Sequence, residues 1–217
     1  EPVSPDGGVS LSTGALAQPQ GLWTSDDRLY VTNANYTIEQ GGVVYGTGQL
    51  SVLDRAELSE VFRWDLPLKN PVHVQAEGDD LWVLCMGDIR RDDNGAFYVA
   101  ESGGLVLIPG GLNEAGESPE MESYPLGSAG SAGSWAWLTD GVRLVLGSSI
   151  SPELYVFNVV ERAWLRGPDD PILEPEPAGT ETLSVAAHPD GHVGVFSFAR
   201  NTARLLDGET FEQRPGT

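Results

Sequence analysis

The segment RLYVTNANY, residues 28–36, decides the fold because the chain repeats it. Its apolar and aromatic residues form a strand pattern that ends at two asparagines. Weaker copies follow, namely DLWVLCMGD at 80–88, RLVLGSSIS at 143–151 and HVGVFSFAR at 192–200. The copies begin 52, 63 and 49 residues apart, and counting from residue 192 past the C-terminus to residue 28 gives 53. Near-equal spacing of this kind predicts a repeat protein with a whole number of repeats.

Each repeat contains short segments rich in β-branched and aromatic residues, separated by Gly, Asp and Asn. In the first repeat the segments are QGLWT (20–24), RLYVTNA (28–34), QLSVLD (49–54) and EVFRWDLP (60–67). No stretch longer than about ten residues shows the apolar periodicity of a helix. The sequence therefore predicts an all-β fold, a β-propeller with four blades of four antiparallel strands each.

The last repeat shows only three strand segments, whereas the chain begins with an extra one. VSLSTGALAQP at 9–19 resembles VFRWDLPLKNP at 61–71, so we expect residues 9–16 to be the outer strand of the last blade and to close the ring. The alternative is a fragment of a larger propeller of about seven blades. One domain covers 1–217, with blades at approximately 18–69, 70–127, 128–179 and 180–217 plus 8–17.

Composition limits the partners. The chain has 32 acidic and 12 basic residues, a formal net charge of −20. Such a surface repels phosphate backbones and anionic lipid, so nucleic acid and bare membrane are not expected as partners. No apolar run reaches about 18 residues, so no transmembrane segment is expected. The single cysteine, Cys85, lies within a strand segment, which predicts a buried, inert thiol. We expect a monomer.

The first repeat resembles the YVTN-repeat β-propeller family. The matching features are Pro19 and Pro71 before inner strands, the turns TSDD, TDG and HPDG, the strand LYVTN and the strand SVLD. The resemblance extends over nearly the whole chain, but only the first repeat keeps the full motif. It implies a secreted or surface-associated binding protein of about seven blades, and relatives with similar repeats include lactone hydrolases and lyases. This resemblance, together with the tether-like start EPVSPDGG, leads us to expect an extracytoplasmic location, which is periplasmic, surface-associated or secreted.

The long connections gather on one face of the predicted propeller. Two join second to third strands, at 33–48 and 87–103, and two join outer to inner strands, at 127–134 and 167–181. The opposite face has mostly tight turns. The first two connections resemble each other, GGVVYGTGQL beside NGAFYVAESGGL, which predicts a duplicated small hairpin. Long loops on one face indicate binding, so we expect a non-catalytic binding or scaffold propeller that recognises a protein, peptide or glycan there.

The candidate ligand-binding residues lie at this face or at the propeller axis. Asn33 and Asn35 stand where the first repeat breaks off, whereas Trp135 is expected to be a solvent-facing aromatic platform. The remaining candidates belong to an inner strand or to the second long connection: Asn70, His73, Asp88, Asp92 and Asp93.

The alternative function is a metal-assisted hydrolase or lyase that acts at the axial opening. His73, Asn70 and the loop carboxylates would hold a divalent cation there, and calcium is the possible metal because the loop carboxylates supply oxygen donors. However, DIRRDDNG at 88–95 lacks the alternating Asp spacing of a calcium loop, and Arg90 and Arg91 favour a self-paired loop. The histidines lack zinc-site spacing, and no Gly-x-Ser-x-Gly motif occurs, so no catalytic residue is predicted.

Overall fold

The computed structural model describes residues 18–39, 42–113, 119–127, 130–173 and 182–214. Every regular element in these ranges is a β-strand, and all strand pairs are antiparallel, which confirms the predicted all-β fold. The strands form four sheets and two separate hairpins. Residues 9–16, predicted to be the closing strand, lie outside the described residues, as does 174–181 of the last long connection.

The first two sheets each have four strands in the predicted places. The first has the order β1-β2-β5-β6, with bounds Pro19–Thr24, Arg28–Asn33, Gln49–Asp54 and Glu60–Asp65. The second has the order β7-β8-β11-β12, with bounds Pro71–Glu77, Asp80–Cys85, Gly104–Ile108 and Glu122–Pro125. In both sheets the chain runs up and down between neighbouring strands, as in a propeller blade.

The last two sheets follow the same order. The third has the order β13-β14-β15-β16, with bounds Ala132–Trp137, Arg143–Ser148, Glu153–Asn158 and Ala163–Arg166. A further short strand, β17 (Ile172–Leu173), pairs with β15, where the sequence predicted only a long connection. The fourth sheet has three described strands, β18 (Leu183–Ala187), β19 (His192–Ser197) and β20 (Thr202–Asp207).

The core lies between successive sheets rather than within one of them. Strand β8 is almost continuously apolar because the neighbouring sheets cover both of its faces. Trp82 and Leu84 pack toward the third sheet, whereas Val83 and Cys85 pack toward the first. Each fully buried Val or Leu side chain contributes about 1.5–3 kcal/mol. The predicted burial of the Cys85 thiol is confirmed, and this burial raises its pKa above the ordinary value.

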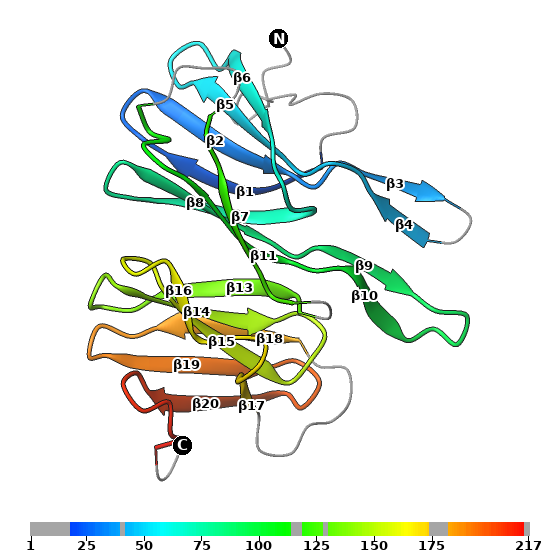
Figure 1. Cartoon of the computed structure of the whole chain (residues 1–217), viewed down its shortest axis with the longest axis vertical. Coiled ribbons are helices and arrows are strands. Elements are labelled where there is room, and N and C mark those ends of the chain that lie inside the picture. Colours follow the sequence, from blue (N-terminus) through cyan, green and yellow to red (C-terminus); the bar gives the residue numbers. More distant parts are fainter. Residues whose placement is uncertain (1–17, 40–41, 114–118, 128–129, 174–181, 215–217) are drawn as a thin grey trace, which may run out of the picture.

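The four sheets follow one another in chain order along the long axis of the molecule (Figure 1). The first sheet lies at one end and the fourth at the other, and no described sheet combines strands from both ends of the chain. The fourth sheet is buried on one face only. Val193 and Val195 of β19 pack against the third sheet, whereas Phe196 and Phe198 are 48% and 72% exposed.

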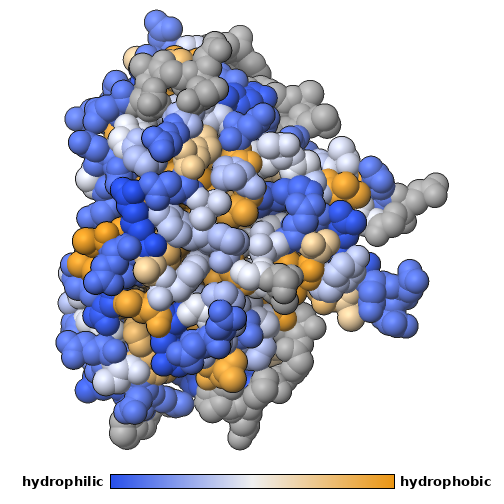
Figure 2. Space-filling model, in the orientation of Figure 1, coloured by the Kyte–Doolittle hydropathy of each residue, from blue (hydrophilic) through white to orange (hydrophobic). Residues whose placement is uncertain are grey.

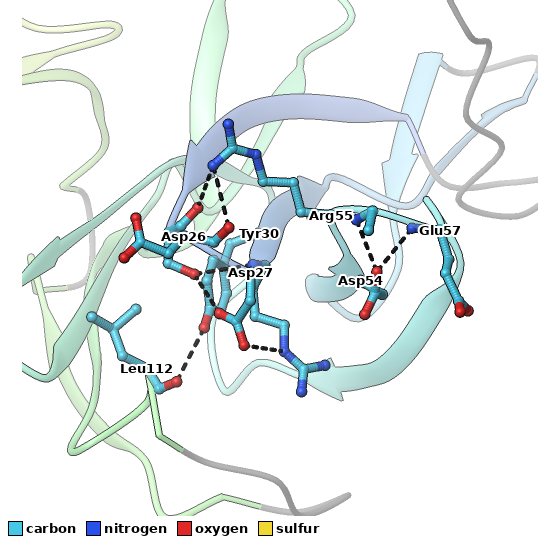
Figure 3. A network of polar contacts seen from close by, with 10 residues as sticks. Asp26, Asp27, Tyr30, Asp54, Arg55, Glu57 and Leu112 are labelled. Atoms are coloured by element: carbon cyan, nitrogen blue, oxygen red, sulfur yellow. Dashed lines mark hydrogen bonds and ion pairs between the residues drawn. The ribbon is translucent and has the colours of Figure 1, made fainter.

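Tight turns occupy one side of the first sheet, as predicted for the face opposite the long connections. There the Asp54 carboxylate accepts the backbone N–H of Glu57 at 2.8 Å. Arg55 donates from Nη1 to the carbonyl oxygens of Ser25, at 3.1 Å, and Asp26, at 3.3 Å. Figure 3 shows this network around the turns that follow β1 and β5. These hydrogen bonds between side chains and backbone groups stabilise the tight turns.

Candidate functional site

Two hairpins project from the side of the molecule away from these turns (Figure 1). The first arm consists of β3 (Tyr36–Glu39) and β4 (Gly42–Tyr45), between β2 and β5. The second arm consists of β9 (Asp88–Arg91) and β10 (Phe97–Glu101), between β8 and β11. The predicted duplicated hairpin is therefore confirmed.

Both arms leave their sheets by the same backbone conformation. Asn35, with φ 50°, and Gly87, with φ 84°, each lie two residues after the end of a second strand. Glycine reaches this left-handed region freely, and asparagine reaches it more easily than most residues. A Cβ on Gly87 would lie 2.3 Å from the carbonyl oxygen of Glu101. The Asn35 amide donates to the carbonyl of Thr47 at 3.0 Å and so ties the two ends of the first arm together.

The other asparagine of the break, Asn33, points into the protein. It is fully buried, and its amide donates to the Ser51 hydroxyl at 2.9 Å across the β2–β5 pair. Of the two asparagines at this break, Asn33 thus fastens the sheet, whereas Asn35 directs the chain into the first arm.

A buried carboxylate anchors the second arm. Asp88 is fully buried and accepts two parallel hydrogen bonds from Arg90, one from Nη2 at 2.7 Å and one from Nε at 3.1 Å. These bonds raise the pKa of Arg90. Lys69 lies 3.6 Å from the same carboxylate and donates to Glu101 at 2.6 Å. Asp88 thus holds Arg90 in place, and the predicted self-pairing of this loop is observed.

The space between the arms, which we call the arm cleft, has a volume of about 690 Å³. It also reaches Ser149, Ile150 and Thr182 at the ends of strands in the third and fourth sheets. A hollow of about 440 Å³ beside Trp64 is smaller. Hydrophobic side chains of both arms lie at the surface (Figure 2). Those that line the cleft are Val43, Val44, Tyr45, Ile89, Phe97 and Tyr98.

The tip of the second arm contains the two remaining acidic candidates. Asp92 accepts the backbone N–H groups of Asn94 at 2.9 Å and Ala96 at 2.8 Å, and so closes the turn. Asp93 is exposed at the tip. Within the described ranges, no three His, Cys, Asp or Glu side chains come together in a way that could hold a metal ion. The calcium site and the metal-assisted reaction stay predictions.

Two of the candidates on inner strands pack against each other. His73 and Trp135 stack with ring centroids 5.9 Å apart, and Nε2 of His73 lies 3.1 Å from the carbonyl oxygen of Gly133. Burial lowers the pKa of His73. Trp135 also packs edge-on against Trp137, so it is half-buried between sheets rather than open to solvent. Its role as an aromatic platform stays a prediction.

Asn70 links the second sheet to the arms. It is buried with φ 54°, and its carbonyl accepts the N–H of Met86 at 2.8 Å just before the second arm. Burial raises the pKa of Tyr45 at the base of the first arm, the charge of Asp88 adds to this, and a hydrogen bond from Asn70 opposes it. Asn70, Tyr45 and Asp88 therefore meet where the two arms begin.

The cleft walls themselves were missed from the sequence. Val44, Phe97 and Tyr98 were seen only as parts of a hairpin pattern, and Arg90 and Arg91 only as partners of the loop carboxylates. The apolar content of these short hairpins was the sequence feature that could have revealed the cleft walls. A hairpin that covers no core exposes its apolar side chains.

Comparison with known proteins supports the fold. No protein-family model matches the sequence, and no curated protein sequence matches it. The β-propeller domain of Cps50 (Swd1) from Myceliophteria thermophila is similar over 88% of this chain and 54% of its own, with 12% identity and a TM-score of 0.56. The computationally designed Ika4 protein is similar over 91% of this chain and 95% of its own, with 11% identity and a TM-score of 0.52.

A structural genomics protein of unknown function from Bacteroides thetaiotaomicron VPI-5482 is similar over 94% of this chain and 44% of its own, with 9% identity and a TM-score of 0.55. The chain thus spans about half the length of two of these three structures. Likenesses at such low identity show the fold alone, and that fold is a β-propeller. Membership of the YVTN-repeat family stays a prediction. Among the described residues, no helix has the length and apolar character needed to cross a membrane.

Proposed function

We propose that the chain is a non-catalytic binding or scaffold propeller whose arm cleft recognises a protein or peptide. The observation that carries this proposal is the set of exposed apolar side chains on the two arms, around a cleft of about 690 Å³. Phe97 is 51% exposed although it lies beside other apolar groups. Clustered apolar surface of this kind is a feature of interaction sites.

The chemistry of the cleft supports binding rather than catalysis. The buried carboxylate of Asp88 is already paired with Arg90, and Lys69 is paired with Glu101. These charges hold the second arm in position, and the walls that remain are mostly apolar. An apolar wall with a few fixed charges at its edge suits a protein segment.

We also infer that the four sheets are an arc of a larger propeller rather than a closed four-bladed ring. The first and fourth sheets lie at opposite ends of the molecule in Figure 1, and among the described residues Phe196 of β19 and Phe198 in the turn after it are exposed. Light scattering over a range of protein concentrations tests this. An uncovered face predicts self-association, whereas a monomer at every concentration would favour the closed ring and the monomeric state expected from the sequence.

We propose an extracytoplasmic location. The only cysteine is buried, so the protein exposes no thiol to an oxidising compartment. Fractionation of the source cells with a specific antibody tests this. Recovery of the protein in the cytoplasmic fraction alone would contradict it.

A peptide-display selection on the purified protein tests the binding function. Enriched peptides are synthesised and titrated against the wild type and against Val44→Ser and Phe97→Ser, one variant in each arm. We expect both variants to weaken binding by about tenfold or more, because each removes an apolar contact. Phe198→Ser is the matched control, since Phe198 is an exposed phenylalanine outside the arm cleft, in the turn after β19.

Several outcomes would contradict the proposal. These are failure to enrich any peptide, equal binding by the arm variants and the wild type, or equal loss in the Phe198→Ser control. A glycan array run on the same samples covers the third ligand class expected from the sequence. Glycan binding that survives both arm variants would place recognition elsewhere.

A further inference from the structure

The arm cleft has a floor in addition to its two walls. The floor consists of Met86 after β8, Ser149 and Ile150 after β14, and Thr182 before β18. The walls belong to the arms, whose strands β4 and β9 are in contact with each other. A strand inserted between two others needs about 10 Å between them, so an extended strand does not fit between the arms. An occupant of the cleft therefore lies on the floor, against the side chains of the arms.

The hydroxyl groups of the floor already donate their protons within the protein. Thr182 donates from Oγ1 to the carbonyl oxygen of Ser149 at 2.8 Å. The Ser131 hydroxyl donates to the carbonyl oxygen of Met86 at 2.7 Å, so the hydrogen bond between the hydroxyls of Ser131 and Ser149 uses the proton of Ser149. A hydroxyl has one proton but two lone pairs. These floor hydroxyls can therefore accept a hydrogen bond from an N–H group but cannot donate one to an anion.

The two arginines that line the cleft differ in what they can still bind. Arg90 is paired with the buried Asp88 carboxylate. Arg91 donates from Nε to the carbonyl oxygen of Gly95 at 2.7 Å, and among the described residues neither of its Nη groups has an acceptor. A guanidinium binds a carboxylate through two parallel hydrogen bonds. Arg91 is therefore the charged donor that the cleft offers to an anion.

An apolar surface adjoins the Arg91 guanidinium. The guanidinium lies 5.2 Å from the centre of the Phe97 ring, and Phe97 is 51% exposed. A ligand that uses both must carry an anion and an apolar group close together. In an extended segment, neighbouring side chains point in opposite directions, and those two residues apart are about 7 Å apart. The last residue of a chain, in contrast, carries a side chain and a main-chain carboxylate on the same Cα.

We propose that the arm cleft binds the C-terminal residue of a protein partner, a bulky apolar residue with a free main-chain carboxylate. This inference rests on the proposed binding function. The carboxylate accepts hydrogen bonds from the Nη groups of Arg91, and the apolar side chain packs against Phe97 and Val44. The main-chain N–H of the same residue donates to a floor hydroxyl. One negative charge suits this chain better than an acidic segment, because its net charge of −20 repels anions.

The probe is a hexapeptide of glycine and serine that ends in phenylalanine with a free carboxylate. It carries rhodamine at its N-terminus, and fluorescence anisotropy measures its binding to the full chain. The same peptide as a C-terminal amide is the charge control, and a free acid that ends in alanine is the side-chain control. We expect each control to bind at least about tenfold more weakly, since one loses the ion pair with Arg91 and the other loses the contact with Phe97.

Two variants separate these two contacts. Arg91→Gln should weaken the free acid by about tenfold or more and leave the amide unchanged, whereas Phe97→Ser should weaken both. Arg55→Gln is the matched control for Arg91→Gln, because Arg55 also donates to backbone carbonyl oxygens but lies at the turns on the opposite side. It should change the binding of neither peptide.

Two further samples distinguish other occupants. A peptide amide that ends in phenylalanine, glycine and glutamate carries its carboxylate on a side chain, and we expect it to bind no better than the phenylalanine amide. Decanoate is an apolar acid without a peptide, and we expect it to bind more weakly than the free-acid peptide. The inference is overturned if either sample matches the free-acid peptide, if the free acid and the amide bind equally, if Arg91→Gln changes nothing, or if no peptide binds.

The display selection separates this inference from the proposed function when it is run in two formats. One format presents free peptide C-termini, and the other joins each peptide to its carrier through the C-terminus. We expect enrichment in the first format alone. Peptides that are enriched in the second format and depend on Val44 and Phe97 would support the proposed function and overturn C-terminal recognition. Failure to enrich peptides in both formats would overturn both.

Discussion

The two arms both begin at a residue with a left-handed backbone conformation, but different contacts hold them in position. The first arm depends on the Asn35 amide and on an edge-to-face contact between Tyr36 and Tyr45, with ring centroids 5.9 Å apart. The second depends on the buried Asp88 and its pair with Arg90. Among the described residues, no ion pair involves β3 or β4. A charged pair therefore anchors the second arm, whereas a neutral hydrogen bond and an aromatic contact anchor the first.

The largest expected effect comes from Gly87→Ala. An alanine there would adopt an unfavourable φ and place its Cβ 2.3 Å from a carbonyl oxygen, so we expect a loss of about 3 kcal/mol in the free energy of unfolding. Denaturant titration measures it. Gly78→Ala is the matched control, because its φ of 60° is also positive but nothing lies within 4 Å of its Cβ, and it should cost only about 1 kcal/mol. Equal losses would mean that the close approach at Gly87 does not matter.

Asp88→Asn should come next, with a loss of about 2 kcal/mol. It removes the buried charge that holds Arg90 and Lys69, but both cations are partly exposed and can turn to solvent. Hydrogen exchange should show lost protection in β9 and β10 and unchanged protection in β3 and β4. Asp93→Asn at the exposed tip should change stability by less than about 0.5 kcal/mol. Equal loosening of both arms by Asp88→Asn would show that they are fixed as one unit.

Asn35→Gly should have a smaller effect on the first arm, a loss of about 1 kcal/mol. The glycine keeps the left-handed backbone but loses the hydrogen bond to Thr47. Hydrogen exchange of β3 and β4 is the measurement. Asn35→Val should be worse than Asn35→Gly, because a β-branched residue resists positive φ. If the glycine variant were the less stable of the two, the backbone role of Asn35 would be wrong.

The smallest expected effect is on pH dependence. Burial raises the pKa of Tyr45 above its ordinary value of 10.0, so the folded protein holds this proton more tightly than the unfolded chain does. The contribution of Tyr45 to stability is therefore complete below about pH 10 and is lost as pH rises further. Tyr45→Phe should flatten the fall in unfolding free energy between roughly pH 9 and 11. Part of the fall should persist, because burial also raises the pKa of Tyr30.

The comparison of the arms also shows how far sequence reasoning reached. The strand segments were predicted in place, because alternating or continuous apolar patterns follow directly from the two-residue period of a strand. The hairpins were predicted from the likeness of two connections. The contacts of single residues could not be predicted, since Asn33 and Asp88 are buried and Trp135 stacks on His73. Residue type alone does not tell whether a polar side chain meets a ligand or another part of the chain.

The sequence by itself determined the order of the strands, the repeat and the points at which the arms leave. These features depend on local preferences, such as the left-handed conformations of Asn35 and Gly87. Only the tertiary structure decided that Val44 and Phe97 line one cleft, that β4 and β9 are in contact, and that Phe196 of β19 is exposed. The physical reason is that such neighbours are brought together by packing between sheets, which no local pattern encodes.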